Sequence, residues 1–185
     1  TPDLLPGDIT GITVYDQRSG EFSFHPGPVF ATIVLADEIN RASPKTQSAL
    51  LEVMEEGYVT VDGTRHPVEA PFLVIATQNP IEQAGTYRLP EAQLDRFLIR
   101  TAIGYPDHGA TVRILSGAAS PRAAVLDSVV DLSTVREMID AARTVHVDAL
   151  ISDYVARLVE ATREHADVRL GASVRGALAL VRCAK

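Results

Sequence analysis

Short hydrophobic runs, separated by a stretch of helical periodicity, dominate the first hundred residues. The segments ATIVLA (31–36) and FLVIAT (72–77) are continuous and contain β-branched residues. Such runs are typical of strands that are buried on both faces in a parallel sheet. LIRTAI (98–103) has a similar composition, and we expect it to form a third strand.

The region between the first two runs has the pattern of an amphipathic helix. Ser43 is a suitable N-cap, Pro44 fits the first helical position, where a missing N–H costs nothing, and Gly57 is a typical terminator. Hydrophobic residues at helical spacing should face the core, namely Leu50, Val53 and Met54. The order strand, helix, strand predicts a parallel α/β unit.

Two hairpins and a short helix complete the first part of the chain. Residues 12–24 alternate apolar and polar side chains around Arg18-Ser19-Gly20, and residues 58–71 contain the turn pair Asp62-Gly63. The segment LPEAQLDRF (89–97) predicts a short helix, with Pro90 and Glu91 in its first turn.

Beyond residue 106 the pattern changes to that of helices. We expect a strand–helix–strand domain over residues 1–106, an Ala- and Ser-rich linker over 107–130, and a small helical domain over 131–185.

Three helix starts are predicted in the last domain. Thr134 with Glu137 matches a capping box, Asp148 precedes the second helix, and Ser173 precedes the third. The expected core positions are Val135, Met138, Ile139 and Ala142 in the first helix and Ile151, Val155, Leu158 and Thr162 in the second.

Polar residues stand where the first two predicted strands end. Asp37 and Glu38 follow one strand, and Asn79 follows the other. Ligands of parallel α/β sheets bind at the carboxyl ends of the strands. There an aspartate can hold Mg²⁺, a glutamate can take a proton from an attacking water, and an amide can hold that water in line. Taken singly, each residue is more commonly a cap or a turn former.

Composition narrows the class of function. The formal net charge is -7 and the only lysines are Lys45 and Lys185, which argues against general nucleic-acid binding. The single cysteine, Cys183, precludes an internal disulfide and favours a reducing compartment. No apolar run is long enough to span a membrane, so we expect a cytoplasmic protein. The five histidines lack the spacing of a zinc hydrolase.

Several long motifs in one order resemble those of the AAA+ ATPases, and among them the MoxR-type family. LADEINRASPKTQSALLEVMEE resembles the Walker B segment and its helix, and VTVDGTRHPVEAPFLVIATQNP the pre-sensor hairpin and sensor 1 strand. GTYRLPEAQLDRF resembles the arginine-finger segment, residues 1–30 the helix-2 insertion, and REHADVRLGASVRGALAL the sensor 2 helix. The resemblance implies an α/β fold with an AAA+ P-loop NTPase-type parallel sheet core, N-terminally incomplete, followed by a small α-helical lid.

The resemblance also implies a role for each candidate residue. Asp37 would hold Mg²⁺ through water, Glu38 would be the general base, and Asn79 would be sensor 1 beside the γ-phosphate of ATP. Arg96 would be the arginine finger that reaches a neighbouring subunit's nucleotide. Arg175 would be sensor 2, reading the γ-phosphate from the lid of its own subunit. An arginine finger that acts on a neighbouring subunit implies a homo-oligomeric ring. The resemblance to the family suggests that this ring is a hexamer.

A phosphate-binding P-loop cannot be located in the sequence. That motif needs a glycine directly before its lysine, whereas Lys45 follows Pro44 and Lys185 follows Ala184. In the family the motif lies upstream of the stretch that resembles residues 1–30. We therefore expect this chain alone to bind ATP weakly or not at all, to be inactive, and to expose apolar sheet surface.

For the intact protein, the resemblance implies an ATP-hydrolysing, chaperone-like motor. It would remodel or activate partner complexes, including metal-cofactor enzymes, and the two hairpins are candidate client contacts. The alternative is a non-catalytic AAA+-like scaffold that binds no nucleotide. A DNA-remodelling relative is disfavoured because the second hairpin carries little net positive charge.

Overall fold

The computed structural model describes residues 4–79, 85–117 and 126–185. The strands of the described part are β1 (Gly11–Asp16), β2 (Glu21–Pro26), β3 (Ile33–Ala36), β4 (Tyr58–Val61), β5 (Thr64–Pro67) and β6 (Leu73–Ala76). The α-helices are α1 (Pro6–Thr10), α2 (Pro44–Glu56), α3 (Glu91–Leu94), α4 (His108–Leu115), α5 (Leu132–Thr144), α6 (Ala149–Glu164) and α7 (Val174–Ala184), and a 3-10 turn spans Ile39–Arg41.

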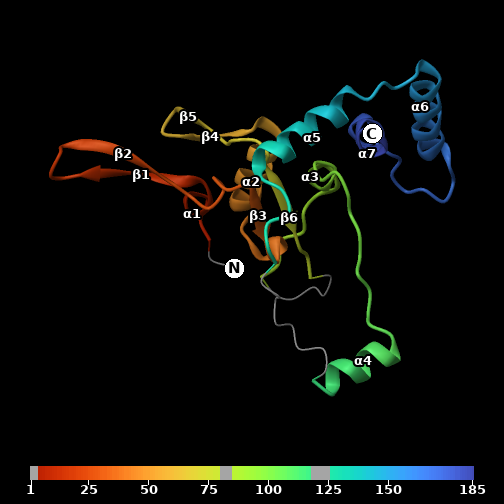
Figure 1. Ribbon diagram of the computed structural model, residues 1–185, viewed down its shortest axis with the longest axis horizontal. Coiled ribbons are helices and arrows are strands. Elements are labelled where there is room, and N and C mark those ends of the chain that lie inside the picture. Colours follow the sequence, from red (N-terminus) through yellow and green to blue (C-terminus); the bar gives the residue numbers. More distant parts are fainter. Residues whose placement is uncertain (1–3, 80–84, 118–125) are drawn as a thin grey trace.

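The centre of the molecule is a parallel pair of strands covered by a helix (Figure 1). β3 pairs with β6, from Ile33 opposite Leu73 to Ala36 opposite Ala76. α2 and the β4–β5 hairpin form the connection between these two strands. The predicted parallel α/β unit is confirmed.

The sequence signals that bound α2 act as predicted. The Ser43 hydroxyl accepts a hydrogen bond from the Thr46 N–H at 3.2 Å, Pro44 is the first helical residue, and Gly57 ends the helix in the left-handed region at φ 71°. The inner face contributes to the core, since Leu50, Leu51 and Val53 are buried and Met54 packs against the core cluster.

The prediction that both strands are buried on both faces is wrong. Their inner side chains, Val34, Ala36, Val74 and Ala76, pack against the core around α2. The outer side chains remain exposed, by 60% at Ile33, 66% at Leu35, 53% at Leu73 and 48% at Ile75. Burial needs a covering layer on each face, and α2 supplies one. The expected exposed apolar sheet surface is therefore present.

Both predicted hairpins form. β1 and β2 pair in antiparallel register around residues 17–20, and β4 pairs with β5 across Asp62 and Gly63, whose φ values are 49° and 78°. Two positive φ values suit the tight two-residue turn that matches strand twist. The hairpins meet where the Phe24 ring stacks on His66, with 3.7 Å between ring centroids.

The prediction of a third strand after residue 97 is wrong, and the region after it contains a helix that was not predicted. Residues 98–103 form no strand, because a strand needs a hydrogen-bonded neighbour and the described part of the chain offers them none; Ile99 and Ile103 are exposed. The expected linker contains α4, whose N-cap Asp107 accepts a hydrogen bond from the Ala110 N–H at 2.7 Å. The short helix α3 begins after Pro90, which is its N-cap.

The three C-terminal helices form, with one start shifted. Asp148 and Ser173 cap α6 and α7 as predicted. α5 is capped by Asp131 instead of Thr134, because the Asp131 carboxylate accepts a hydrogen bond from the Thr134 N–H at 2.8 Å.

The expected core positions of these helices are only partly covered. Met138, Ile151 and Leu158 are exposed, and Val159 is the buried residue of α6. With few neighbouring elements, an amphipathic helix leaves part of its apolar stripe in water.

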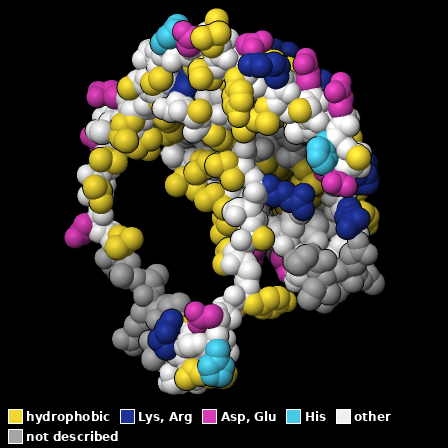
Figure 2. Space-filling model, turned by 90° about the vertical axis from the view of Figure 1, so that its right-hand side faces the viewer, with side chains coloured by type: hydrophobic (Ala, Val, Ile, Leu, Met, Phe, Trp, Pro, Cys, Tyr) yellow, Lys and Arg dark blue, Asp and Glu magenta, His cyan; other side chains and the backbone are white. Residues whose placement is uncertain are grey.

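The long axis of the molecule separates the β1–β2 hairpin at one end from α6 and α7 at the other, and α4 lies apart from both (Figure 1). Figure 2 shows hydrophobic side chains exposed among charged ones on the surface above α4. No helix in the described residues is long and apolar enough to cross a lipid bilayer.

Candidate functional site

The residues that follow β3 and β6 form a hydrogen-bonded corner. Because Ala36 lies opposite Ala76, Asp37 and Thr77 leave the two strands side by side. The Thr77 hydroxyl donates to the Asp37 carboxylate at 2.5 Å and accepts from the Glu38 N–H at 2.9 Å. Parallel register thus places both acids beside the next strand, as the sequence predicts.

Glu38 has an unusual backbone conformation. Its φ and ψ are 50° and 51°, in the left-handed region that residues with side chains rarely adopt. The Ile39 N–H donates to the Thr77 carbonyl at 3.0 Å, which holds the turn against β6. The Glu38 carboxylate pairs with the Arg41 guanidinium at 2.9 Å. Such outliers concentrate at functional sites.

Two buried amides hold the loop after β6 against this turn. The Asn40 side-chain amide donates to the Asn79 carbonyl at 3.2 Å. Gln47 on α2 donates to the carbonyls of Ile39 at 3.1 Å and Tyr87 at 3.0 Å. Asn40 and Gln47 are only 8% and 2% exposed. We call Asp37, Glu38, Thr77 and Asn79 the strand-end site.

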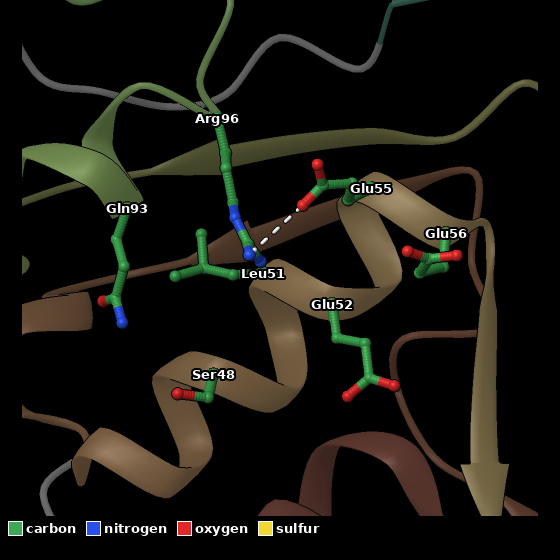
Figure 3. Close-up of a pocket in the computed structure, with 7 residues that line it drawn as sticks. All are labelled: Ser48, Leu51, Glu52, Glu55, Glu56, Gln93 and Arg96. Atoms are coloured by element: carbon green, nitrogen blue, oxygen red, sulfur yellow. Dashed lines mark ion pairs between the residues drawn. The ribbon is translucent and has the colours of Figure 1, made fainter.

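Arg96 and Arg175 lie on the other end of α2. Arg96 follows Asp95, the C-cap of α3, and its guanidinium is 3.2 Å from the Glu55 carboxylate (Figure 3). Arg175, in the first turn of α7, pairs with the same carboxylate. We call Glu55, Arg96 and Arg175 the arginine cluster.

Two further polar contacts join α7 and its approach to α3. The Ser173 hydroxyl, which also caps α7, donates to the Asp95 carboxylate at 2.5 Å. Arg169 pairs with Glu91 at 3.5 Å. The helical domain is therefore tied to the first domain near the arginine cluster by side-chain contacts.

The structure thus gathers the five candidate residues into two groups. Asp37 and Glu38 meet beside Thr77, and the Asn79 backbone carbonyl accepts from Asn40 next to the same turn, while Arg96 and Arg175 meet on Glu55. The described residues contain no group of three or more His, Cys, Asp or Glu that could hold a metal ion by themselves.

Sequence reasoning missed Thr77, Asn40, Gln47 and Glu55. Thr77 appeared only as the last residue of a predicted strand, although a hydroxyl at a strand end is a detectable signal. Asn40 and Gln47 act on carbonyl groups more than five residues away, and Glu55 acts on residues far along the chain. Nothing in the local pattern marks these contacts.

Comparison with known proteins agrees with this architecture. The model of the "ATPase family associated with various cellular activities (AAA)" matches residues 1–99. The chain is 48% identical to protein YeaC of Bacillus subtilis over 186 residues, covering 100% of the chain and 58% of YeaC. It is 46% identical to chaperone MoxR1 of Mycobacterium tuberculosis over 196 residues, covering 100% of the chain and 51% of MoxR1.

A solved structure shows the same fold. The crystal structure of a candidate ATPase from Cytophaga hutchinsonii matches with a TM-score of 0.82 and 40% identity, over 98% of this chain and 58% of that one. The chain therefore spans between half and three-fifths of the length of these relatives.

Proposed function

Because the chain belongs to the MoxR-type AAA+ ATPases, we propose that it is part of an ATP-hydrolysing motor that remodels or activates partner protein complexes. The strand-end site carries the proposal. An aspartate and a glutamate follow one strand, and an asparagine follows its parallel neighbour, with Thr77 bridging the two strand ends. Ligands of parallel α/β sheets bind at the carboxyl ends of the strands, which supports the proposal.

The chemistry of the strand-end site fits Mg²⁺ and ATP. Asp37 offers hard carboxylate oxygens and is held by the Thr77 hydroxyl, so it would bind Mg²⁺ through the metal's waters. Bound Mg²⁺ would neutralise charge on the phosphates. Glu38 would take the proton of the attacking water, and Asn79 would orient that water as sensor 1.

The arginine cluster supplies the positive charge that phosphoryl transfer requires. Arg96 is our arginine finger and would reach the nucleotide of a neighbouring subunit, while Arg175 would read the γ-phosphate from the lid as sensor 2. In this chain both guanidinium groups pair with Glu55. We further propose a homo-oligomeric ring of six subunits in the cytoplasm, with protein complexes as clients, metal-cofactor enzymes among them.

The assignment of Glu38 is tested by Glu38→Gln in the full-length gene product. The amide cannot accept the proton, so we expect kcat for ATP hydrolysis to fall by about 100-fold or more, while ATP affinity stays at the wild-type value. Steady-state phosphate release and binding of a fluorescent ATP analogue measure the two quantities. Glu56→Gln, at the end of α2, is the matched control and should behave as wild type.

The outcomes separate the alternatives. Wild-type turnover in Glu38→Gln would overturn the base assignment. A full-length gene product that binds no ATP would instead favour the non-catalytic scaffold.

A further inference from the structure

Glu55 pairs with both arginines that the proposed function assigns to nucleotide phosphates, Arg96 and Arg175. It lies in the last turn of α2, Arg96 follows α3, and Arg175 lies at the start of α7. One carboxylate oxygen is 3.2 Å from the Arg96 guanidinium, and the other pairs with Arg175. Each arginine thus takes a different oxygen of the same carboxylate.

The pairing is partly shielded from solvent. The exposed fractions of the side chains are 30% for Arg96, 37% for Glu55 and 44% for Arg175. The side chain of Arg96 extends across α2 beside Leu51, on one side of a cavity of about 250 Å³, and points at Glu55 (Figure 3). Ion pairs with reduced solvent exposure are screened less than those between fully exposed charges.

Each arginine of the cluster keeps donors that Glu55 does not use. Glu55 pairs with both guanidinium groups, and Glu52 and Glu56 line the adjoining cavity. Each guanidinium carries five N–H donors, far more than a pairing with one carboxylate oxygen uses. Donors therefore remain for phosphoryl oxygens while Glu55 offsets the repulsion between the two arginines.

We propose that Glu55 is a positioning residue that holds Arg96 in the orientation needed for phosphoryl transfer and couples it to the lid through Arg175. The inference rests on the proposed function, in which both arginines meet nucleotide phosphates. Glu55 touches no reacting atom; it acts through the two guanidinium groups. Loss of its charge leaves Arg96 free to rotate and cuts the link to α7.

Glu52 offers a matched control. It lies one turn earlier on α2, borders the same cavity, and points away from Arg96 (Figure 3). Among the described residues it has no ion pair. Glu55→Gln and Glu52→Gln remove the same charge from the same helix, so they separate positioning from a general effect of charge.

The experiment measures ATP hydrolysis by the full-length gene product and its variants at saturating Mg²⁺. For Glu55→Gln we expect kcat to fall by about tenfold to 100-fold, as for other losses of orientation, with KM and the melting temperature unchanged. For Glu52→Gln we expect wild-type kcat and KM. A loss in kcat alone marks an interaction made in the transition state, which a purely structural role of Glu55 would not produce.

A double variant sharpens the result. If Glu55 acts through Arg96, then Glu55→Gln should have little further effect in an Arg96→Lys background, because effects within one contact network are not additive. Wild-type kcat in Glu55→Gln, or a kcat above wild type, would overturn the proposal. Failure of the proposed function is distinguishable: unchanged kcat in Arg96→Ala would remove the arginine finger itself, whatever Glu55 does.

Discussion

The strand-end site and the arginine cluster are held in place by different kinds of contact. At the strand-end site the register of two parallel strands places Asp37 beside Thr77, and backbone hydrogen bonds from Glu38 and Ile39 fix the turn. The arginine cluster depends on ion pairs between long side chains of three separate elements. The first arrangement is part of the sheet, and the second is a contact between domains.

The two regions also differ in packing. The strand-end site follows β3 and β6, whose inner faces pack against the core around α2, although Asp37, Thr77 and Asn79 are themselves exposed. The helices of the lid touch the first domain through polar side chains such as Ser173 and Arg169. Partly exposed ion pairs stabilise by about 1 kcal/mol or less, so these contacts should contribute less to stability than the packing around α2.

The packing contrast predicts the largest effect on stability. Leu51 on α2 is completely buried, whereas Leu158 on α6 is 43% exposed. Leu51→Ala should lower the free energy of unfolding by about 2–5 kcal/mol through lost burial and a residual cavity, and Leu158→Ala by less than about 1.5 kcal/mol. Urea denaturation followed by circular dichroism measures both. Equal losses would show that the two regions are packed alike.

A substitution at Thr77 is expected to have an intermediate effect, which is measured on ATP hydrolysis. Thr77→Val removes the hydroxyl that joins Asp37 to the Glu38 N–H. A hydrogen bond to a charged group contributes about 1.5–3 kcal/mol, and each 1.4 kcal/mol corresponds to about tenfold in rate. We expect kcat of the full-length gene product to fall by about tenfold to 100-fold.

The control for Thr77 is Thr60→Val, an exposed threonine on β4. Thr60→Val also removes a threonine hydroxyl, but from a strand outside the strand-end site. The kcat of this variant should be that of wild type. If Thr77→Val also keeps wild-type turnover, the hydroxyl bridge does not position the acids.

The same contrast explains how much the sequence could predict. Local signals were sufficient where the structure is local, as with Ser43 and Gly57 around α2, the Asp62-Gly63 turn, and Ser173 before α7. The strand-end residues were predictable because parallel pairing follows from the strand–helix–strand order. The shared pairing on Glu55 joins residues 120 positions apart, and no periodicity contains that information.

Predictions that depended on a neighbour were the ones that proved wrong. Residues 98–103 have the composition of a strand but have no partner in the described part of the chain. β3 and β6 have the composition of strands buried on both faces but are covered on one. The composition of a segment indicates which secondary structure it can form. The elements packed against the segment determine whether it pairs as a strand and how many of its faces are buried.

The start of α5 was also misplaced, because Asp131 and Thr134 lie three residues apart and both are good N-caps. In the structure Asp131 is the N-cap. Its pKa is lowered to about 2 by hydrogen bonds from the Thr134 N–H and the Ser133 hydroxyl. A folded-state pKa below the ordinary value of 3.8 means that the ionised form favours the helix. The contribution of the cap is therefore present above pH 3.8 and is lost as the pH falls towards 2.

Removal of the Asp131 cap should give the smallest of the expected effects. It tests how far α5, a helix of the lid, depends on local contacts. Asp131→Ala should reduce the helical circular dichroism signal slightly at pH 7, because the Thr134 N–H loses its acceptor. Thr134→Ala should leave the signal unchanged, since the backbone N–H remains. Carboxyl carbon NMR should show Asp131 titrating near pH 2. A loss of helix in Thr134→Ala and not in Asp131→Ala would move the start of α5 back to the capping box that the sequence first indicates.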